Sequence, residues 1–124
     1  MSNTEKKPTL VIGASPKPER YSNMAVRKLL KHNHPVFALG GRDDEAEGVK
    51  IETGFPDFEG VHTVTMYMNA QRQKQYYDYI LGLKPKRIIF NPGAENPEFM
   101  RMAEEHGIEV IPACTLVMLS TNQF

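Results

Sequence analysis

A short apolar run that passes through a loop into a helix-forming stretch constrains this chain most. Residues 9–13 are apolar and partly β-branched, which predicts a short strand buried on both faces of a sheet. A loop of Gly, Ala, Ser, Pro and Lys follows, and a helix is expected over residues 23–32, with Ser22 as its N-cap. Because a strand leading directly into a helix is the unit of parallel sheets, this segment already favours an α/β fold.

The rest of the chain continues the alternation of strands and helices. Further strands are expected at residues 36–39, 49–53, 61–68, 87–90 and 109–112, helices at 70–81 and 98–106, and a short helical turn at 113–119. Residues 40–48 are expected to form a loop, and 49–53 a short edge strand. On the helix 70–81, Gln73 is expected on the exposed side. The pattern predicts an α/β fold of the Rossmann-like type, a three-layer sandwich with a mostly parallel central sheet.

Composition narrows the classes of function. The 124 residues contain 15 Lys and Arg against 15 Asp and Glu, so no broad basic surface for nucleic acid is expected. We expect a tail at residues 1–8 and a single domain at 9–124. No apolar run reaches the length of about 18 residues that a membrane-spanning helix needs, and the first residues lack a signal-peptide pattern, so a cytoplasmic protein without membrane contact is expected.

The loop after the first strand has the chemistry of an anion site. Gly13 leaves room for backbone amides to approach a ligand, and the following helix would direct its unpaired N–H groups back at the loop. Lys17 and Arg20 add full charges there. The alternative is a tight strand-to-helix turn with solvated charges. The loop lacks the further glycines of a G-x-G-x-x-G motif and is not a Walker loop.

Ligands of parallel sheets bind at the carboxyl ends of the strands, where several loops of this chain would meet. A nicotinamide-binding fold that holds a simple ribose places Asp or Glu after its second strand, whereas this chain has Gly40, Gly41 and Arg42. An arginine there suits a ribose phosphate, as in NADP or coenzyme A (CoA). The alternative is that Arg42 pairs with its neighbours Asp43 and Asp44.

Three motifs together resemble the small CoA-binding proteins, which are similar to the first domain of the succinyl-CoA synthetase α subunit and of NDP-forming acyl-CoA synthetases. These motifs are Gly13-Ala14-Ser15-x-Lys17-x-x-Arg20-x-Ser22, Asn91-Pro92-Gly93-x-Glu95-Asn96 and Cys114-Thr115. The resemblance spans residues 9–119 and implies CoA or an acyl-CoA as ligand. The residues that it implies as ligand-binding are Gly13, Ala14, Ser15, Lys17, Arg20, Ser22, Asn23, Gly40, Gly41, Arg42, Met66, Tyr67, Met68, Asn69, Asn91, Pro92, Gly93 and Glu95.

The resemblance also has limits. Family members often carry Asn-Pro where this chain has Gly40 to Arg42, so this chain departs from the family at the place that the resemblance gives to the adenosine phosphate. The ligases carry their phosphorylated histidine in a later domain, which this chain does not contain, so a non-catalytic binding module is expected.

No other residues indicate catalysis or a metal. The four histidines read as structural, Cys114 lacks a catalytic neighbour, and no set of ligands has metal-site spacing. Two alternatives to the CoA-binding module are an NADP-type nucleotide binder or redox sensor, and a structural domain that docks a partner. A protein partner or a homo-oligomer is left open.

Overall fold

The computed structural model of the chain describes residues 5–124, so residues 1–4 of the expected N-terminal tail lie outside the described part. The strands are β1 (Thr9–Ile12), β2 (Val36–Leu39), β3 (Asp44–Ala46), β4 (Val49–Glu52), β5 (Thr63–Met66), β6 (Arg87–Phe90) and β7 (Glu109–Pro112). The helices are α1 (Tyr21–Lys31), α2 (Ala70–Gln73), the 3₁₀ helix η2 (Lys74–Tyr76), α3 (Tyr77–Leu83), α4 (Pro97–Glu105) and α5 (Thr115–Ser120).

The strands form one sheet of seven in the order β3-β4-β2-β1-β5-β6-β7. Every neighbouring pair runs parallel except β3 and β4, which are antiparallel. β2 and β4 lie on one side of β1. The chain then crosses back, so that β5, β6 and β7 lie on the other side of β1. The fold is therefore the α/β Rossmann-like fold that the sequence predicts, with its topological switch point between β1 and β5.

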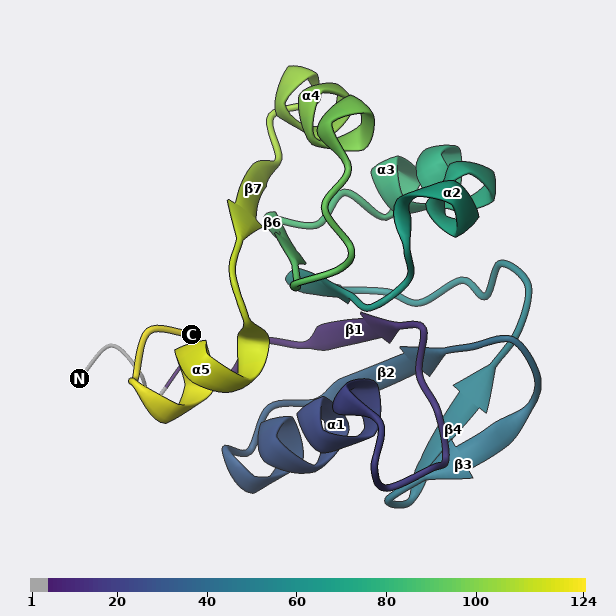
Figure 1. The fold of residues 1–124 in the computed structure, drawn as a ribbon, viewed down its shortest axis with the longest axis vertical. Coiled ribbons are helices and arrows are strands. Elements are labelled where there is room, and N and C mark those ends of the chain that lie inside the picture. Colours follow the sequence, from purple (N-terminus) through teal and green to yellow (C-terminus); the bar gives the residue numbers. More distant parts are fainter. Residues whose placement is uncertain (1–4) are drawn as a thin grey trace.

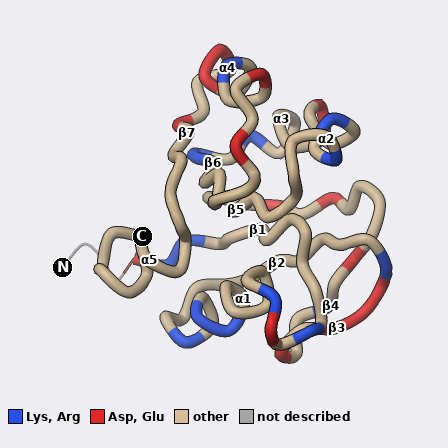
Figure 2. The backbone as a smooth tube through the Cα atoms, in the orientation of Figure 1, with Lys and Arg blue, Asp and Glu red and all other residues tan. Residues whose placement is uncertain are grey.

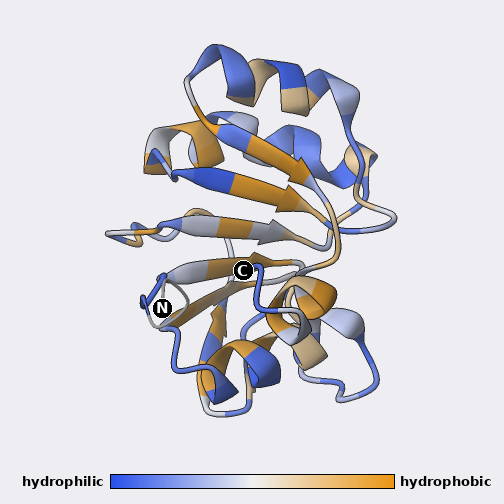
Figure 3. Cartoon of the chain, turned by 90° about the vertical axis from the view of Figure 1, so that its left-hand side faces the viewer, coloured by the Kyte–Doolittle hydropathy of each residue, from blue (hydrophilic) through white to orange (hydrophobic). Residues whose placement is uncertain are grey.

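Helices cover both faces of the sheet, α1 and α5 on one and α2, α3 and α4 on the other (Figure 1). The core alternates accordingly along β1, since Leu10 and Ile12 pack toward α3 and α4, and Val11 packs toward α1 and α5. Figure 3 shows the apolar residues concentrated along the central strands and on the helix surfaces that meet them. Burial on both faces explains why these strands are nearly continuous apolar runs.

The acidic stretch expected as a loop contains a strand. Residues 44–46 form β3, which pairs with β4 through a tight turn at Glu47 and Gly48, both with positive φ angles of 53° and 82°. Two consecutive residues with positive φ angles are typical of a two-residue hairpin turn. The prediction that residues 49–53 form the edge strand was therefore wrong, because β3 lies outside β4. Only Ala46 of β3 is buried, so it carries no apolar pattern.

The helix expected over residues 70–81 is broken into α2, η2 and α3. Gln73, expected to be exposed, is fully buried. Its side-chain nitrogen donates to the carbonyls of Met68 at 2.7 Å and Ala94 at 2.8 Å, and its oxygen accepts from Asn96 at 2.9 Å. This inward amide ties α2 to the loop after β6, which positions two of the segments that border the site.

Candidate functional site

A cleft of about 490 Å³ opens at the carboxyl ends of the strands, beside the switch point. Its walls come from the loops after β1, β2, β5 and β6 and from the first turns of α1 and α2. The lining residues are Gly13, Ala14, Ser15, Pro16, Lys17, Arg20, Tyr21, Ser22, Gly41, Arg42, Tyr67, Met68, Arg72 and Pro92. Segments far apart in the sequence thus meet where a parallel sheet of this topology places its ligand.

Helix α1 begins earlier than its sequence indicates. The N-cap is Arg20, whose backbone is extended and whose side chain makes no capping hydrogen bond, so the prediction of Ser22 as N-cap was wrong. The Arg20 amide donates to the Lys17 carbonyl at 3.1 Å, and this turn already directs the chain into the helix. Ser22 instead lies buried in the first helical turn, where it lines the cleft.

The backbone amides available to an anion differ from those expected. Gly13 and Ala14 both donate to the carbonyl of Leu39, at 2.9 and 3.0 Å, so the sheet already uses these two amides. The amides of Ser15, Tyr21 and Ser22 have no acceptor among the described residues. The positive end of the α1 dipole lies at the last two of these groups, so the free donors sit at the helix start rather than at the glycine.

Two glycines of the predicted site shape its floor through close packing. A Cβ atom on Gly13 would lie 3.1 Å from the backbone carbon of Tyr67, and Gly13 has a φ of +93°. A Cβ on Gly40 would lie 2.7 Å from the carbonyl oxygen of Ala14 and 2.8 Å from a methyl of Ile51. Both positions therefore require glycine for the approach of neighbouring chain segments, whatever occupies the cleft.

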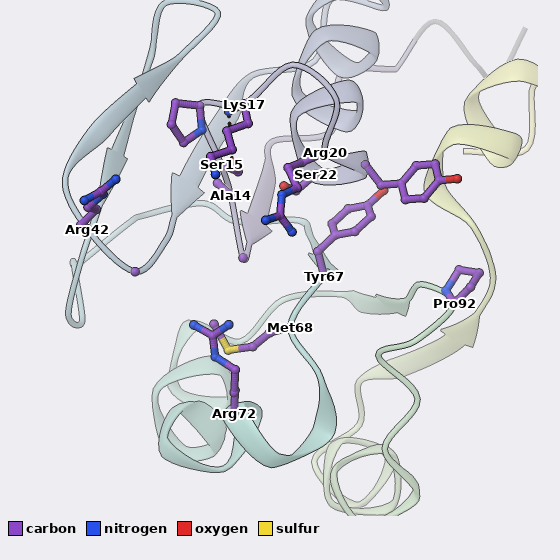
Figure 4. A pocket seen from close by; sticks show the side chains of 14 residues that line it. Ala14, Ser15, Lys17, Arg20, Ser22, Arg42, Tyr67, Met68, Arg72 and Pro92 are labelled. Carbon is purple, nitrogen blue, oxygen red and sulfur yellow. Dashed lines mark hydrogen bonds between the residues drawn. The ribbon is translucent and has the colours of Figure 1, made fainter.

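Four cationic side chains line the cleft, Lys17 and Arg20 from the loop before α1, Arg42 from the loop after β2 and Arg72 from α2. Figure 4 shows Arg20 and Arg72 extending from opposite walls toward the same space. Figure 2 shows Lys and Arg positions along the loop before α1, the loop after β2 and α2. Among the described residues that line the cleft there is no Asp or Glu. The cleft is consequently suited to a ligand with several negative charges.

Arg42 is free to face a ligand. Asp43 accepts a hydrogen bond from the Thr53 hydroxyl at 3.3 Å, and Asp44 accepts one from the Glu45 amide at 2.8 Å. Within residues 5–124 neither carboxylate forms an ion pair with Arg42. The alternative that Arg42 is held by its acidic neighbours thus lacks the contact it requires.

Several predicted site residues lie beside the cleft rather than in its lining. They are Asn23, Gly40, Met66, Asn69, Asn91, Gly93 and Glu95. Asn23 donates to the Ser15 carbonyl at 2.9 Å and accepts from Arg27 at 3.0 Å, which fixes the loop before α1. Asn69 caps α2 by accepting from the Arg72 amide at 2.9 Å. Met66 is fully buried in the sheet.

The loop after β6 is held by its own side chains. Asn91 donates to the Thr65 hydroxyl at 2.8 Å and to the Met66 carbonyl at 2.9 Å, and it accepts from the Thr115 amide at 2.8 Å. Glu95 accepts from the amide of Gly93 at 2.9 Å. Among the predicted residues of this loop, Pro92 alone lines the cleft. The Asn-Pro-Gly motif therefore orients the loop through internal hydrogen bonds.

Three lining residues were missed by sequence reasoning, namely Pro16, Tyr21 and Arg72. Arg72 follows a strand by a few residues and lies in the first turn of the next helix, as Ser22 does in α1. This position in the first helical turn after a strand is the sequence signal that could have identified Arg72 as a site residue, because first helical turns border the carboxyl edge of a parallel sheet.

Comparison with known proteins decides the family. Residues 7–120 match the family described as the CoA binding domain. This chain belongs to that family. Its expected resemblance is thereby confirmed, and the match favours CoA over NADP as the class of ligand. No curated protein matches the chain.

Several solved structures have the same fold as this chain. One described as an uncharacterized protein is 47% identical, with a TM-score of 0.94 over 97% of this chain and 99% of that chain. The cell-free ID.343 protein of Thermus thermophilus is 21% identical, with a TM-score of 0.85 over 98% of this chain and 93% of that chain. An acetyl-coenzyme A synthetase of Ca. Korarchaeum cryptofilum is 19% identical, with a TM-score of 0.71 over 86% of this chain and 25% of that one. The last two identities show a shared fold alone.

The histidines of this CoA-binding domain lie outside the cleft lining. His34 accepts from the Lys7 amide at 3.0 Å, and burial lowers the pKa of His34 to about 4. Burial also lowers the pKa of His62, which bonds the Thr63 hydroxyl. His32 and His106 each donate to a carbonyl one turn earlier in their helix, at 2.9 Å.

Residues 5–124 contain neither a cluster of metal ligands nor a helix that could span a membrane. Among residues 5–124, no three His, Cys, Asp or Glu side chains gather closely enough to hold a metal ion. None of the helices in that range is both long and apolar enough to cross a membrane.

Proposed function

We propose that this protein is a CoA-binding module that holds CoA or an acyl-CoA in the polar cleft and is not catalytic by itself. The phosphates lie at the loop of residues 13–20 and at the start of α1. The adenosine 3′-phosphate lies near Arg42. The family match supports the ligand class, and the cleft supports the placement.

One observation carries this proposal. The cleft combines Lys17, Arg20, Arg42 and Arg72 with the unpaired amides of the first turn of α1, and no described carboxylate lines it. CoA carries a diphosphate and a separate ribose phosphate, so it presents charges to more than one wall. Guanidinium groups bind phosphate oxygens through paired hydrogen bonds, which suits the three arginines.

The described lining of the cleft supports the proposal of a non-catalytic role. Its lining residues include no histidine, cysteine or carboxylate that could carry a phosphoryl or acyl group. The synthetase that shares this fold is much longer, and the present chain covers 25% of it. We therefore expect that purified protein incubated with CoA, acetate and ATP forms no acetyl-CoA above a protein-free control. Thioester formation that depended on a histidine of this chain would contradict the role.

The ligand can be identified by thermal shift and by mass spectrometry of the purified protein. A ligand that binds the folded state alone raises the melting temperature, and the rise grows with the logarithm of the ligand concentration divided by the dissociation constant. We expect CoA to stabilise the protein, NADP to do so less at equal concentration, and any co-purified ligand to have the mass of CoA or an acyl-CoA. Stabilisation by NADP in preference to CoA would support the nucleotide-binder alternative. Stabilisation by neither would support a docking domain without a nucleotide ligand.

A further inference from the structure

Arg72 reaches the polar cleft from a helix that is too short to be stable by itself. α2 has only four residues, Ala70–Gln73, whereas isolated helices shorter than about 12–15 residues are at best marginally stable in water. The Arg72 side chain is exposed and makes no hydrogen bond or ion pair with another described residue. The position of this guanidinium at the cleft therefore depends on what holds the backbone of α2.

Two side chains hold α2, one at each end. Asn69 caps its start by accepting from the Arg72 amide at 2.9 Å. At its other end, the fully buried Gln73 donates from Nε2 to the carbonyl of Met68 at 2.7 Å and to that of Ala94 at 2.8 Å. Met68 lines the cleft, and Ala94 belongs to the loop after β6, which also contributes to the lining. One buried amide thus joins three segments of the cleft wall.

The surroundings of Gln73 match an amide and no other side chain of this length. Its nitrogen has two N–H donors and meets two carbonyls, while its oxygen accepts from Asn96 at 2.9 Å. The same Asn96 nitrogen also donates to the Tyr77 hydroxyl at 2.9 Å. A carboxylate in place of the amide would set negative charge against two carbonyl oxygens, and a methionine would offer neither of them a donor. The identity of the residue therefore determines whether α2 is anchored.

We infer that Gln73, together with the Asn69 cap, is a positioning residue for the ligand and acts through Arg72. Gln73 is absent from the cleft lining, so it influences a bound anion only by holding α2 in place. The inference rests on the proposed function, because the phosphates of CoA are what Arg72 would contact. Arg72 points into the cleft from the wall opposite Arg20 (Figure 4). A cation whose backbone is fixed in advance loses less conformational freedom when the ligand binds.

A double-mutant cycle with CoA as the probe tests this dependence. Gln73→Met keeps the length of the side chain and removes both donors. We expect it to weaken CoA binding severalfold, up to the roughly tenfold effect expected for Arg72→Ala. With Arg72→Ala already present, the same substitution is expected to change the affinity less than about twofold. A role in stability alone would not depend on Arg72. Calorimetry well below the melting temperature of each variant gives the four affinities.

Tyr77→Phe is the matched control. It removes a hydrogen bond of the same side-chain network but leaves the bonds from Gln73 to both carbonyls in place, so CoA affinity is expected to equal that of wild type. Asn69→Ala gives a second test that does not depend on the folding of the Gln73 variant. Asn69 is exposed, and its loss frees the other end of α2, so its effect is also expected to vanish when Arg72 is alanine.

The outcomes separate the inference from the proposed function. Wild-type affinity in the folded Gln73→Met variant would overturn the inference and leave the proposed function standing. So would equal weakening by Gln73→Met or by Asn69→Ala with and without Arg72, since the side chain would then act by another route. Absence of CoA binding by the folded wild type would overturn both.

Discussion

The α-carbon of Gly13 lies directly against the backbone of Tyr67, so that a Cβ atom there would stand 3.1 Å from the Tyr67 carbonyl carbon. This contact joins the loop after β1 to the loop after β5. These two loops diverge at the switch point of the sheet, and the polar cleft opens between them. Because Gly13 has no side chain, the two loops that form the walls of the cleft can approach each other closely at its base.

Replacement of Gly13 by alanine is expected to lower the free energy of unfolding by about 1–3 kcal/mol, the cost of holding a residue with a side chain at positive φ. Gly41→Ala is the control. Gly41 also lines the cleft, yet a Cβ there meets nothing within 4 Å and its φ is not in the positive range. Chemical denaturation of both variants measures the effect. Equal stabilities would show that the close approach does not require glycine.

Lys17→Ala is expected to weaken CoA binding by about 1–2 kcal/mol, the scale of a charge-assisted hydrogen bond to phosphate. Lys17 is exposed, so little change in stability is expected. Lys50→Ala removes an equally exposed charge on β4, away from the cleft, and is expected to leave the affinity unchanged. Calorimetric titration of both variants with CoA compares them. The same affinity in the Lys17 variant as in wild type removes Lys17 from the site.

Arg42 is expected to read the 3′-phosphate of CoA. Wild-type protein then prefers CoA over dephospho-CoA by about 1.5–3 kcal/mol, and Arg42→Ala abolishes this preference. Higher salt is expected to narrow the difference, because the exposed loop leaves the pair partly screened. Competition titrations with both ligands provide the measurement. If wild type bound the two equally, Arg42 would have no role in phosphate recognition.

His34 is expected to make stability depend on pH. Burial lowers its pKa from 6.5 to about 4, so the unfolded chain binds the proton more readily than the folded protein. The free energy of unfolding is therefore expected to fall as the pH drops from 6.5 toward 4. His34→Gln keeps an acceptor for the Lys7 amide but does not titrate, and it should show a shallower slope. Identical slopes in denaturation across this range would exclude His34 as the cause.

The sequence was most informative where burial dictated composition. The strands β2, β6 and β7 lie at the expected residues. All four residues of β6 are buried, and burial on both faces of a strand leaves an apolar or β-branched run. β3 was not predicted because it is a short edge strand of a hairpin and has exposed acidic residues. The helix expected at residues 70–81 is interrupted because Gln73 turns inward and donates hydrogen bonds to two carbonyls. A glutamine in the sequence does not by itself indicate such a contact.

The site shows the same division. The loop after β1 and Arg42 were predicted at the site because ligands of parallel sheets bind at the carboxyl ends of the strands, where cations suit an anionic ligand. Asn91 was predicted at the ligand, and in the structure its side chain donates to the Thr65 hydroxyl and accepts from the Thr115 amide, so its contact with a ligand stays a prediction. Arg72 was missed, since only the placement of α2 at the carboxyl edge of the sheet brings it to the cleft.

Titration of CoA into wild-type protein and into Arg72→Ala tests the central claim most directly, because Arg72 entered the site through the structure alone. We predict one CoA per chain, with affinity weakened on the order of tenfold in the Arg72 variant, as expected for a lost charge-assisted phosphate contact. Arg101→Ala removes an exposed arginine of α4, away from the cleft, and is predicted to bind as wild type does. No binding of CoA by the folded wild type, or the same affinity in the Arg72 and Arg101 variants, would contradict the account.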